Sequence, residues 1–184
     1  MIFFKIILPS IICTLIIVTT QISIEYYPIS FGLVLGLINW KNYKFNPYLG
    51  LFFTIIISFV CFLLAYISFP LLSTILKPLL GEDLSSFISI EIAAFVIGPL
   101  LVFFSYSYIF NYPKKSIITR NIILGVIIIL VFVSTLFFIL PDSKITTLLK
   151  DIKLRHYTIW QIVMALGIQL IIYQKEIFFR LKSL

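Results

Sequence analysis

The chain has 184 residues, of which 61% are hydrophobic and 11% are charged, and its mean hydropathy is +1.17. A soluble domain is about 25% charged and about half apolar, so this composition excludes a water-soluble fold. The formal net charge of +7 is not evidence for a nucleic-acid partner, because basic residues in a membrane protein first report topology.

Six apolar segments follow one another along the chain and predict membrane-spanning helices, each of which needs about 20 residues. They are Ile2 to Thr20, Pro28 to Trp40, Tyr48 to Phe69, Phe87 to Tyr108, Asn121 to Leu140 and Tyr157 to Tyr173. The second segment is too short unless it includes flanking residues, so five spans remain the alternative if it is re-entrant. The sequence therefore predicts an all-α polytopic membrane helix bundle with short loops, formed by a single integral membrane domain over residues 1–184.

The basic residues predict the orientation of these spans. With six spans and a cytoplasmic N-terminus, most of the 14 Lys and Arg residues lie in the cytoplasm, as the positive-inside rule requires. They are Lys5, Lys41, Lys44, Lys114, Lys115, Arg120, Lys175, Arg180 and Lys182. We expect an integral protein of the bacterial cytoplasmic membrane with both termini in the cytoplasm. Its expected partners are the lipid bilayer and other membrane proteins or a second copy of the chain.

Aromatic residues and prolines support the predicted helix ends. Tyr and Trp prefer the level of the lipid headgroups, and they gather at these ends: Tyr26, Tyr27, Trp40, Tyr43, Tyr48, Tyr66, Tyr106, Tyr108, Tyr112, Tyr157, Trp160 and Tyr173. Prolines lie at the same boundaries, where helices begin or stop: Pro28, Pro47, Pro70, Pro113 and Pro141. Pro99 instead follows Gly98 in the middle of the fourth segment and predicts a kink there.

Between the last two segments, apolar residues recur at helical spacing at Ile145, Leu148, Leu149 and Ile152. This pattern is typical of a short helix on the membrane surface. The alternative is a disordered basic loop.

Small residues form a stripe along the third segment, at Thr54, Ser58, Cys61, Ala65 and Ser68. Their alternating spacing of four and three residues places them on one helix face, where small side chains let membrane helices pack closely. The alternative is a polar substrate path. In the second segment, Gly32 and Gly36 form a GxxxG motif, which indicates close packing on a neighbouring helix rather than a dimer interface.

Glu91 is the main candidate for a binding residue, because ionisable groups inside membrane segments are costly and are commonly functional. Glu91 and Gln161 are each the fifth residue of their segments, which enter the membrane from the same side. The two side chains could therefore share a hydrogen bond. Gln161, Ala165 and Gln169 form a second polar and small face. We predict ligand or proton binding by Glu91, Gln161 and Gln169. The alternative is that Glu91 lies at the membrane interface and that the two glutamines contribute only to helix packing.

No catalytic motif is present: the sequence has no HExxH, GxSxG, P-loop or paired acidic residues. Cys13 and Cys61 lie within apolar runs, and His156 is the single histidine, so we predict no catalytic residue, no metal site and no cofactor. The leading hypothesis is a non-enzymatic membrane subunit of a transport or cell-envelope complex. The alternatives are a small transporter or membrane enzyme that uses Glu91, and an immunity-type protein against a membrane-active toxin.

Overall fold

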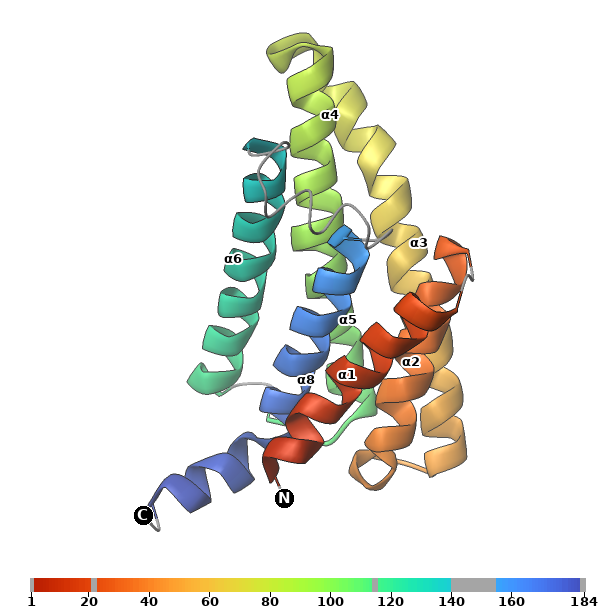
Figure 1. Ribbon diagram of the computed structural model, residues 1–184, viewed down its shortest axis with the longest axis vertical. Helices are drawn as coiled ribbons and strands as arrows, with labels where there is room; N and C mark the ends of the chain where they lie inside the picture. The colour runs from red at the N-terminus through yellow and green to blue at the C-terminus, as the bar shows by residue number, and fades with distance from the viewer. Residues whose placement is uncertain (1, 21–22, 114–115, 140–154, 183–184) are drawn as a thin grey trace.

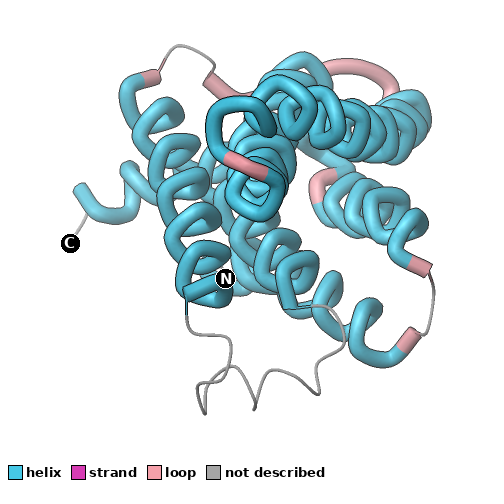
Figure 2. The backbone as a smooth tube through the Cα atoms, turned by 90° about the horizontal axis from the view of Figure 1, so that it is seen from above, coloured by secondary structure: helices cyan, strands magenta, loops and turns pink. Residues whose placement is uncertain are grey.

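The computed structural model describes residues 2–20, 23–113, 116–139 and 155–182, and helices make up these ranges apart from short loops (Figure 2). In chain order the helices are α1 (Ile2–Thr19), α2 (Tyr27–Ile38), α3 (Pro47–Leu80), α4 (Glu82–Ile90), the π-helix η3 (Glu91–Ile97), α5 (Gly98–Ile109), α6 (Ile117–Ile139) and α8 (Arg155–Lys182), with 3₁₀ turns η1 (Ile24–Tyr26) and η2 (Trp40–Asn42). The protein is an all-α membrane bundle, as predicted (Figure 1). The expected surface helix around residues 145–152 lies outside the described residues.

Five helices in the described part of the chain are long and apolar enough to cross a membrane: Ile2–Thr19, Pro47–Leu80, Glu82–Ile109, Ile117–Leu136 and Tyr157–Phe179. The second predicted segment forms α2, which has only 12 residues. This short helix packs mainly on α3, while α1 packs mainly on α8. In Figure 1 the turn between α1 and α2 lies well below the turn between α3 and α4.

Prolines begin α2 and α3, as expected, with Pro28 and Pro47 in their first turns. The prediction that Pro70 ends the third segment is wrong, because α3 continues through Pro70 and Pro78 to Leu80. Proline removes one backbone N–H from the helix without removing the later hydrogen bonds, so a helix with enough other contacts can continue past it. The chain then turns at Gly81, whose φ of 78° favours glycine.

The lower end of the bundle in Figure 1 carries the start of α1 and the end of α8. The α2–α3 loop and the end of α5 join them there: Asn42 Nδ2 donates to Tyr173 Oη (3.1 Å), and the Lys44 N–H donates to the Ile109 carbonyl (3.1 Å). Lys5 Nζ lies 5.2 Å from the centre of the Tyr173 ring. These contacts hold the ends of four segments together.

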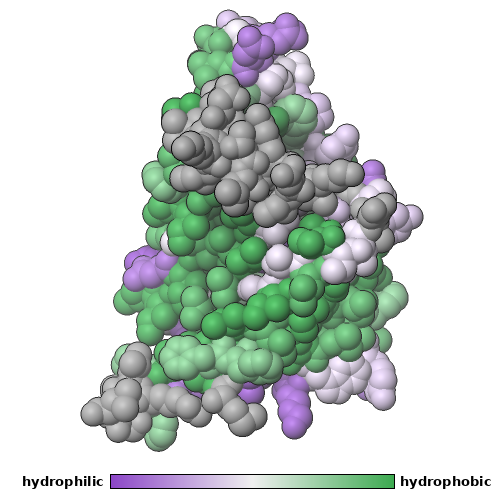
Figure 3. Space-filling view, viewed as in Figure 1, coloured by the Kyte–Doolittle hydropathy of each residue, from purple (hydrophilic) through white to green (hydrophobic). Residues whose placement is uncertain are grey.

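Most basic residues with described side chains belong to segments whose ends lie at this lower end, namely the start of α1 (Lys5), the α2–α3 connection (Lys41 and Lys44), the first turn of α6 (Arg120) and the later part of α8 (Lys175). Lys77 lies at the opposite end, where its Nζ is 2.9 Å from Glu82 Oε1. Figure 3 shows an apolar face between hydrophilic residues at the top, over α4, and at the lower edge. Such an apolar belt between polar ends is typical of a protein that crosses a lipid bilayer.

Candidate functional site

The long helix from Glu82 to Ile109 contains a π-helical segment, Glu91–Ile97. The cause lies in the residues that follow it. The Gly98 N–H donates to the Ala93 carbonyl five residues back, and Pro99 has no N–H to donate to the Ala94 carbonyl. Segments of this kind are rare and are frequent at functional sites.

Trp160 on α8 donates to the Ala94 carbonyl through its indole Nε1, at 3.0 Å. The backbone of the π segment provides no donor for this carbonyl, and a buried carbonyl without a hydrogen bond is costly. The Trp160 indole supplies the donor. The sequence analysis treated Trp160 as an interfacial residue. Its indole also bonds inside the bundle, to the carbonyl that Pro99 leaves without a backbone donor.

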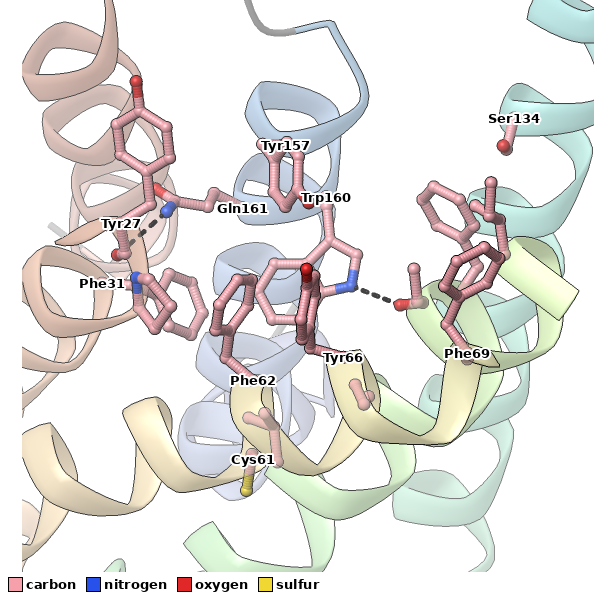
Figure 4. Close-up of a pocket in the computed structure, with 18 of the residues that line it drawn as sticks. Tyr27, Phe31, Cys61, Phe62, Tyr66, Phe69, Ser134, Tyr157, Trp160 and Gln161 are labelled. Atoms are coloured by element: carbon pink, nitrogen blue, oxygen red, sulfur yellow. Dashed lines mark hydrogen bonds between the residues drawn. The ribbon is translucent and has the colours of Figure 1, made fainter. Parts of the chain in front are cut away.

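A cavity of about 510 Å³ lies beside the π segment, between α3, α4 and α8 (Figure 4). Aromatic rings form much of its wall and polar groups are few. Its lining residues come from α2 (Tyr27, Pro28, Phe31), α3 (Ser58, Cys61, Phe62, Ala65, Tyr66, Phe69), α4 and η3 (Phe87, Ile90, Glu91, Ala93, Ala94, Phe95), α5 (Gly98, Val102), α6 (Ser134) and α8 (Tyr157, Trp160, Gln161). Ligand sites of proteins commonly have this size and this mainly apolar lining.

Glu91, the first residue of the π segment, lines this cavity and is only 7% exposed. Neither of its carboxyl oxygens makes a hydrogen bond with a described residue. The Ser134 hydroxyl on α6 interacts with the carboxyl, but not in hydrogen-bonding geometry. A buried ionisable group without a partner is strongly unfavourable. Glu91 is therefore the most unusual polar group among the described residues.

Gln161 lines the same cavity from α8, but the hydrogen bond expected between it and Glu91 is not formed. Its Nε2 donates to the Tyr27 carbonyl at 3.1 Å, and its Oε1 has no partner among the described residues. Figure 4 shows the Gln161 amide directed toward Tyr27 on α2. The two side chains share a cavity rather than a bond.

Gln169 lies two turns further along α8 and does not line the cavity. Its side chain is fully buried, and neither amide atom has a hydrogen-bond partner among the described residues. Ala165, between the two glutamines, is also fully buried. This arrangement does not support a binding role for Gln169 in the same site.

The stripe of small residues on α3 packs against α2 and α5. Thr54, Ser58, Cys61 and Ala65 are buried, whereas Ser68 is half-buried and donates to the Ala65 carbonyl. The Thr54 hydroxyl donates to the Gly50 carbonyl (2.7 Å) and the Ser58 hydroxyl to the Thr54 carbonyl (2.6 Å), so the helix itself satisfies these groups. Ser58, Cys61 and Ala65 also form part of the cavity wall.

Tyr106 on α5 completes this stripe, which the sequence analysis did not anticipate. It was placed at the headgroup level, but its side chain is fully buried and its hydroxyl lies 2.6 Å from that of Ser58. The Cys61 sulfur lies 3.7 Å from the Ser105 hydroxyl. The contact between α3 and α5 therefore includes interhelical polar contacts as well as small residues.

The GxxxG glycines lie where α2 crosses α3. A Cβ atom on Gly32 would lie 2.8 Å from the Thr54 carbonyl oxygen and 2.9 Å from the Ile55 Cα. A Cβ atom on Gly36 would lie 2.6 Å from Leu51 Cδ1. The absence of a side chain is what allows the two helices to approach this closely, and this contact supports the α2 wall of the cavity.

No group of three His, Cys, Asp or Glu side chains that could hold a metal ion occurs within residues 2–20, 23–113, 116–139 and 155–182. Cys13 and Cys61 are both free and buried. The side chain of His156 lies outside the described residues. Comparison with known protein families, curated proteins and solved structures gave no match to this chain.

Proposed function

We propose that this protein is a small membrane binding or transport protein that accepts an apolar molecule in the cavity beside the π segment. The observation that carries the proposal is the Glu91 carboxyl, which is buried, lines the cavity and lacks a hydrogen-bond partner among the described residues. A polar group on an otherwise apolar bound molecule would supply the missing partner. The cavity volume of about 510 Å³ is within the range for small-molecule sites, roughly 300–1,000 Å³.

Two aromatic contacts between α2 and α8 support a preformed site. The Phe31 and Trp160 ring centres are 5.5 Å apart, and those of Tyr27 and Tyr157 are 6.5 Å apart. Such ring pairs restrict side-chain rotation, and the Trp160 bond to Ala94 adds a further constraint. A preformed wall lowers the entropy lost on binding.

Filling the cavity should abolish binding. In a Trp40→Phe background, which leaves Trp160 as the single tryptophan, diphenylhexatriene should accept energy from Trp160 in a saturable manner in detergent. Ala94→Phe should remove the saturable component, because the added ring occupies the cavity wall. The matched control is Ile128→Phe, at an exposed position of α6, which should bind as the parent does. Equal transfer in the parent and in Ala94→Phe would contradict the proposal.

We also propose that the lower end of the bundle faces the cytoplasm of a bacterial cell, because described basic residues gather there and such residues are retained on that side during insertion. In a background that lacks Cys13 and Cys61, cysteine at Asp83 should react with an impermeant thiol reagent in intact cells. Cysteine at Lys41 or Glu176 should react only after permeabilisation. All three positions are exposed. The reverse pattern of labelling would invert this orientation.

A second candidate, a subunit of a transport or cell-envelope complex, is favoured by the α3–α4 hairpin. The 34 residues of α3 extend about 51 Å at 1.5 Å per residue, more than the hydrocarbon core of about 30 Å. Figure 1 shows this hairpin beyond the ends of the other helices. Leu71, Ile75 and Leu79 are exposed on it at intervals of four residues. This function does not use the cavity, so the Ala94→Phe variant would retain it.

A further inference from the structure

The polar groups that face the cavity indicate what kind of molecule it accepts. The buried side-chain atoms without partners on its wall are Oε1 and Oε2 of Glu91 and Oε1 of Gln161. All three are oxygens, and Gln161 Nε2 already donates to the Tyr27 carbonyl. No described Lys, Arg or His lines the cavity. The described part of the wall therefore offers electron pairs and one carboxyl group, and it holds no cationic side chain.

Aromatic rings line the same cavity. Phe62, Tyr66 and Phe69 come from α3, and Tyr157 and Trp160 come from α8 (Figure 4). The faces of aromatic rings attract cations, and rings arranged around a site are a known way to bind quaternary ammonium groups. A carboxylate together with several rings is complementary to a positively charged group on an apolar body.

We propose that the cavity binds a hydrophobic organic cation, with the Glu91 carboxylate as its counter-ion and the aromatic wall around its apolar part. This inference rests on the proposed function, because it specifies the molecule that occupies the same cavity. Glu91 lies 18 residues before Ile109, which corresponds to roughly 25 Å along the helix. The carboxyl is thus near the membrane boundary opposite the termini, where a charged group can enter from water and an apolar body from lipid.

Binding of the cation releases a proton. In the empty cavity the neutral acid is the favoured form of an unpaired buried carboxyl. The exchange is balanced: the carboxylic acid and the cation give a carboxylate–cation pair and one proton, which leaves to water. The other titratable groups on the wall are Cys61 and the phenols of Tyr27, Tyr66 and Tyr157, and groups of these types are neutral at neutral pH. Glu91 is the single carboxyl group on the described wall.

The test compares two probes that share one body, neutral diphenylhexatriene and its trimethylammonium derivative, whose charge does not change with pH. Energy transfer from Trp160 in the Trp40→Phe background reports both. The cationic probe should bind at least on the order of tenfold more weakly to Glu91→Gln than to the parent, since the variant loses a charge-assisted contact. The neutral probe should bind equally to both, which also shows that the variant is folded.

The dependence on pH provides a second measurement. Binding of the cationic probe to the parent should weaken as the buffer becomes acidic, because protons compete for the Glu91 carboxylate, and binding to Glu91→Gln should not change. If both probes bind the parent and neither distinguishes the variant, the cation site is wrong but the apolar cavity remains. If the variant loses both probes equally, Glu91 supports the cavity instead of binding a cation. If neither probe binds the parent, both proposals fail.

Discussion

Replacing Gly32 with alanine is expected to destabilise the bundle by about 1–3 kcal/mol, the usual cost of forcing an extra carbon into a packed interior. The new Cβ would lie 2.8 Å from the Thr54 carbonyl oxygen and 2.9 Å from the Ile55 Cα. Both are backbone atoms of α3, so no side-chain rotation can relieve the contact. The midpoint of unfolding by a denaturing detergent in mixed micelles would measure the loss.

Gly125→Ala is the matched control for this substitution. Gly125 lies within α6, and no atom lies within 4 Å of a Cβ built there. Alanine has a higher helix propensity than glycine by about 1 kcal/mol, so the control should be neutral or slightly stabilising. If both variants unfold at the same point as the parent, the close approach of α2 to α3 is not a determinant of stability.

Gln169→Leu is expected to stabilise the protein by about 1–3 kcal/mol, which is the cost of a buried polar group without a hydrogen bond. The Gln169 side chain is fully buried, and its Nε2 and Oε1 are without partners in the part of the chain that the structure describes. Leucine has a similar size and removes both polar atoms. Unfolding in mixed micelles should require more denaturing detergent than for the parent.

Gln174→Leu should have the opposite effect and serves as the comparison on the same helix. The Gln174 amide is buried, and it donates to the Thr119 hydroxyl and the Ile171 carbonyl, both at 3.0 Å. Its Oε1 accepts a bond from Ser116 at 3.3 Å. Removing these bonds leaves Thr119 and Ser116 without this partner. If Gln169→Leu is as destabilising as Gln174→Leu, Gln169 has a partner in the folded protein that lies outside the described residues.

The helical membrane architecture could be predicted from the sequence. A lipid bilayer requires long apolar helices, and basic residues gather in the loops on one side of it. The stripe of small residues could also be placed on one face of the third segment, since the spacing from Thr54 to Ala65 follows the helical period. The end of α3 could not be placed correctly. Pro70 and the more polar residues after it are typical of a loop, but α3 is held as a helix by its packing on α4.

The cavity could be predicted only in part. Glu91 and Gln161 were recognised because polar groups in membrane segments are rare, and the structure places both on the wall of one cavity. Trp160 and Tyr106 were assigned to the headgroup level from their proximity to segment ends. Their actual positions depend on which helices meet, since Trp160 bonds to Ala94 and Tyr106 to Ser58. One signal was available: Pro99 leaves a carbonyl in the turn before it without a backbone donor, which indicates that another group must supply it. The structure shows that this carbonyl is that of Ala94.

The π segment makes the cavity sensitive to the length of the chain as well as to its composition. A hydrogen-bonded turn of a π-helix contains one more residue than a turn of an α-helix, so Glu91–Ile97 carries the equivalent of a one-residue insertion. Each α-helical residue turns the helix by about 100°. Seven π-helical residues turn through nearly the same total angle as six α-helical residues, so deleting one residue here would restore a regular α-helix and leave Glu91 facing almost the same direction relative to α5. In a regular α-helix the Gly98 N–H would donate to the Ala94 carbonyl, so a homologue without this insertion could keep the same glutamate and yet lose the acceptor that now binds the Trp160 indole.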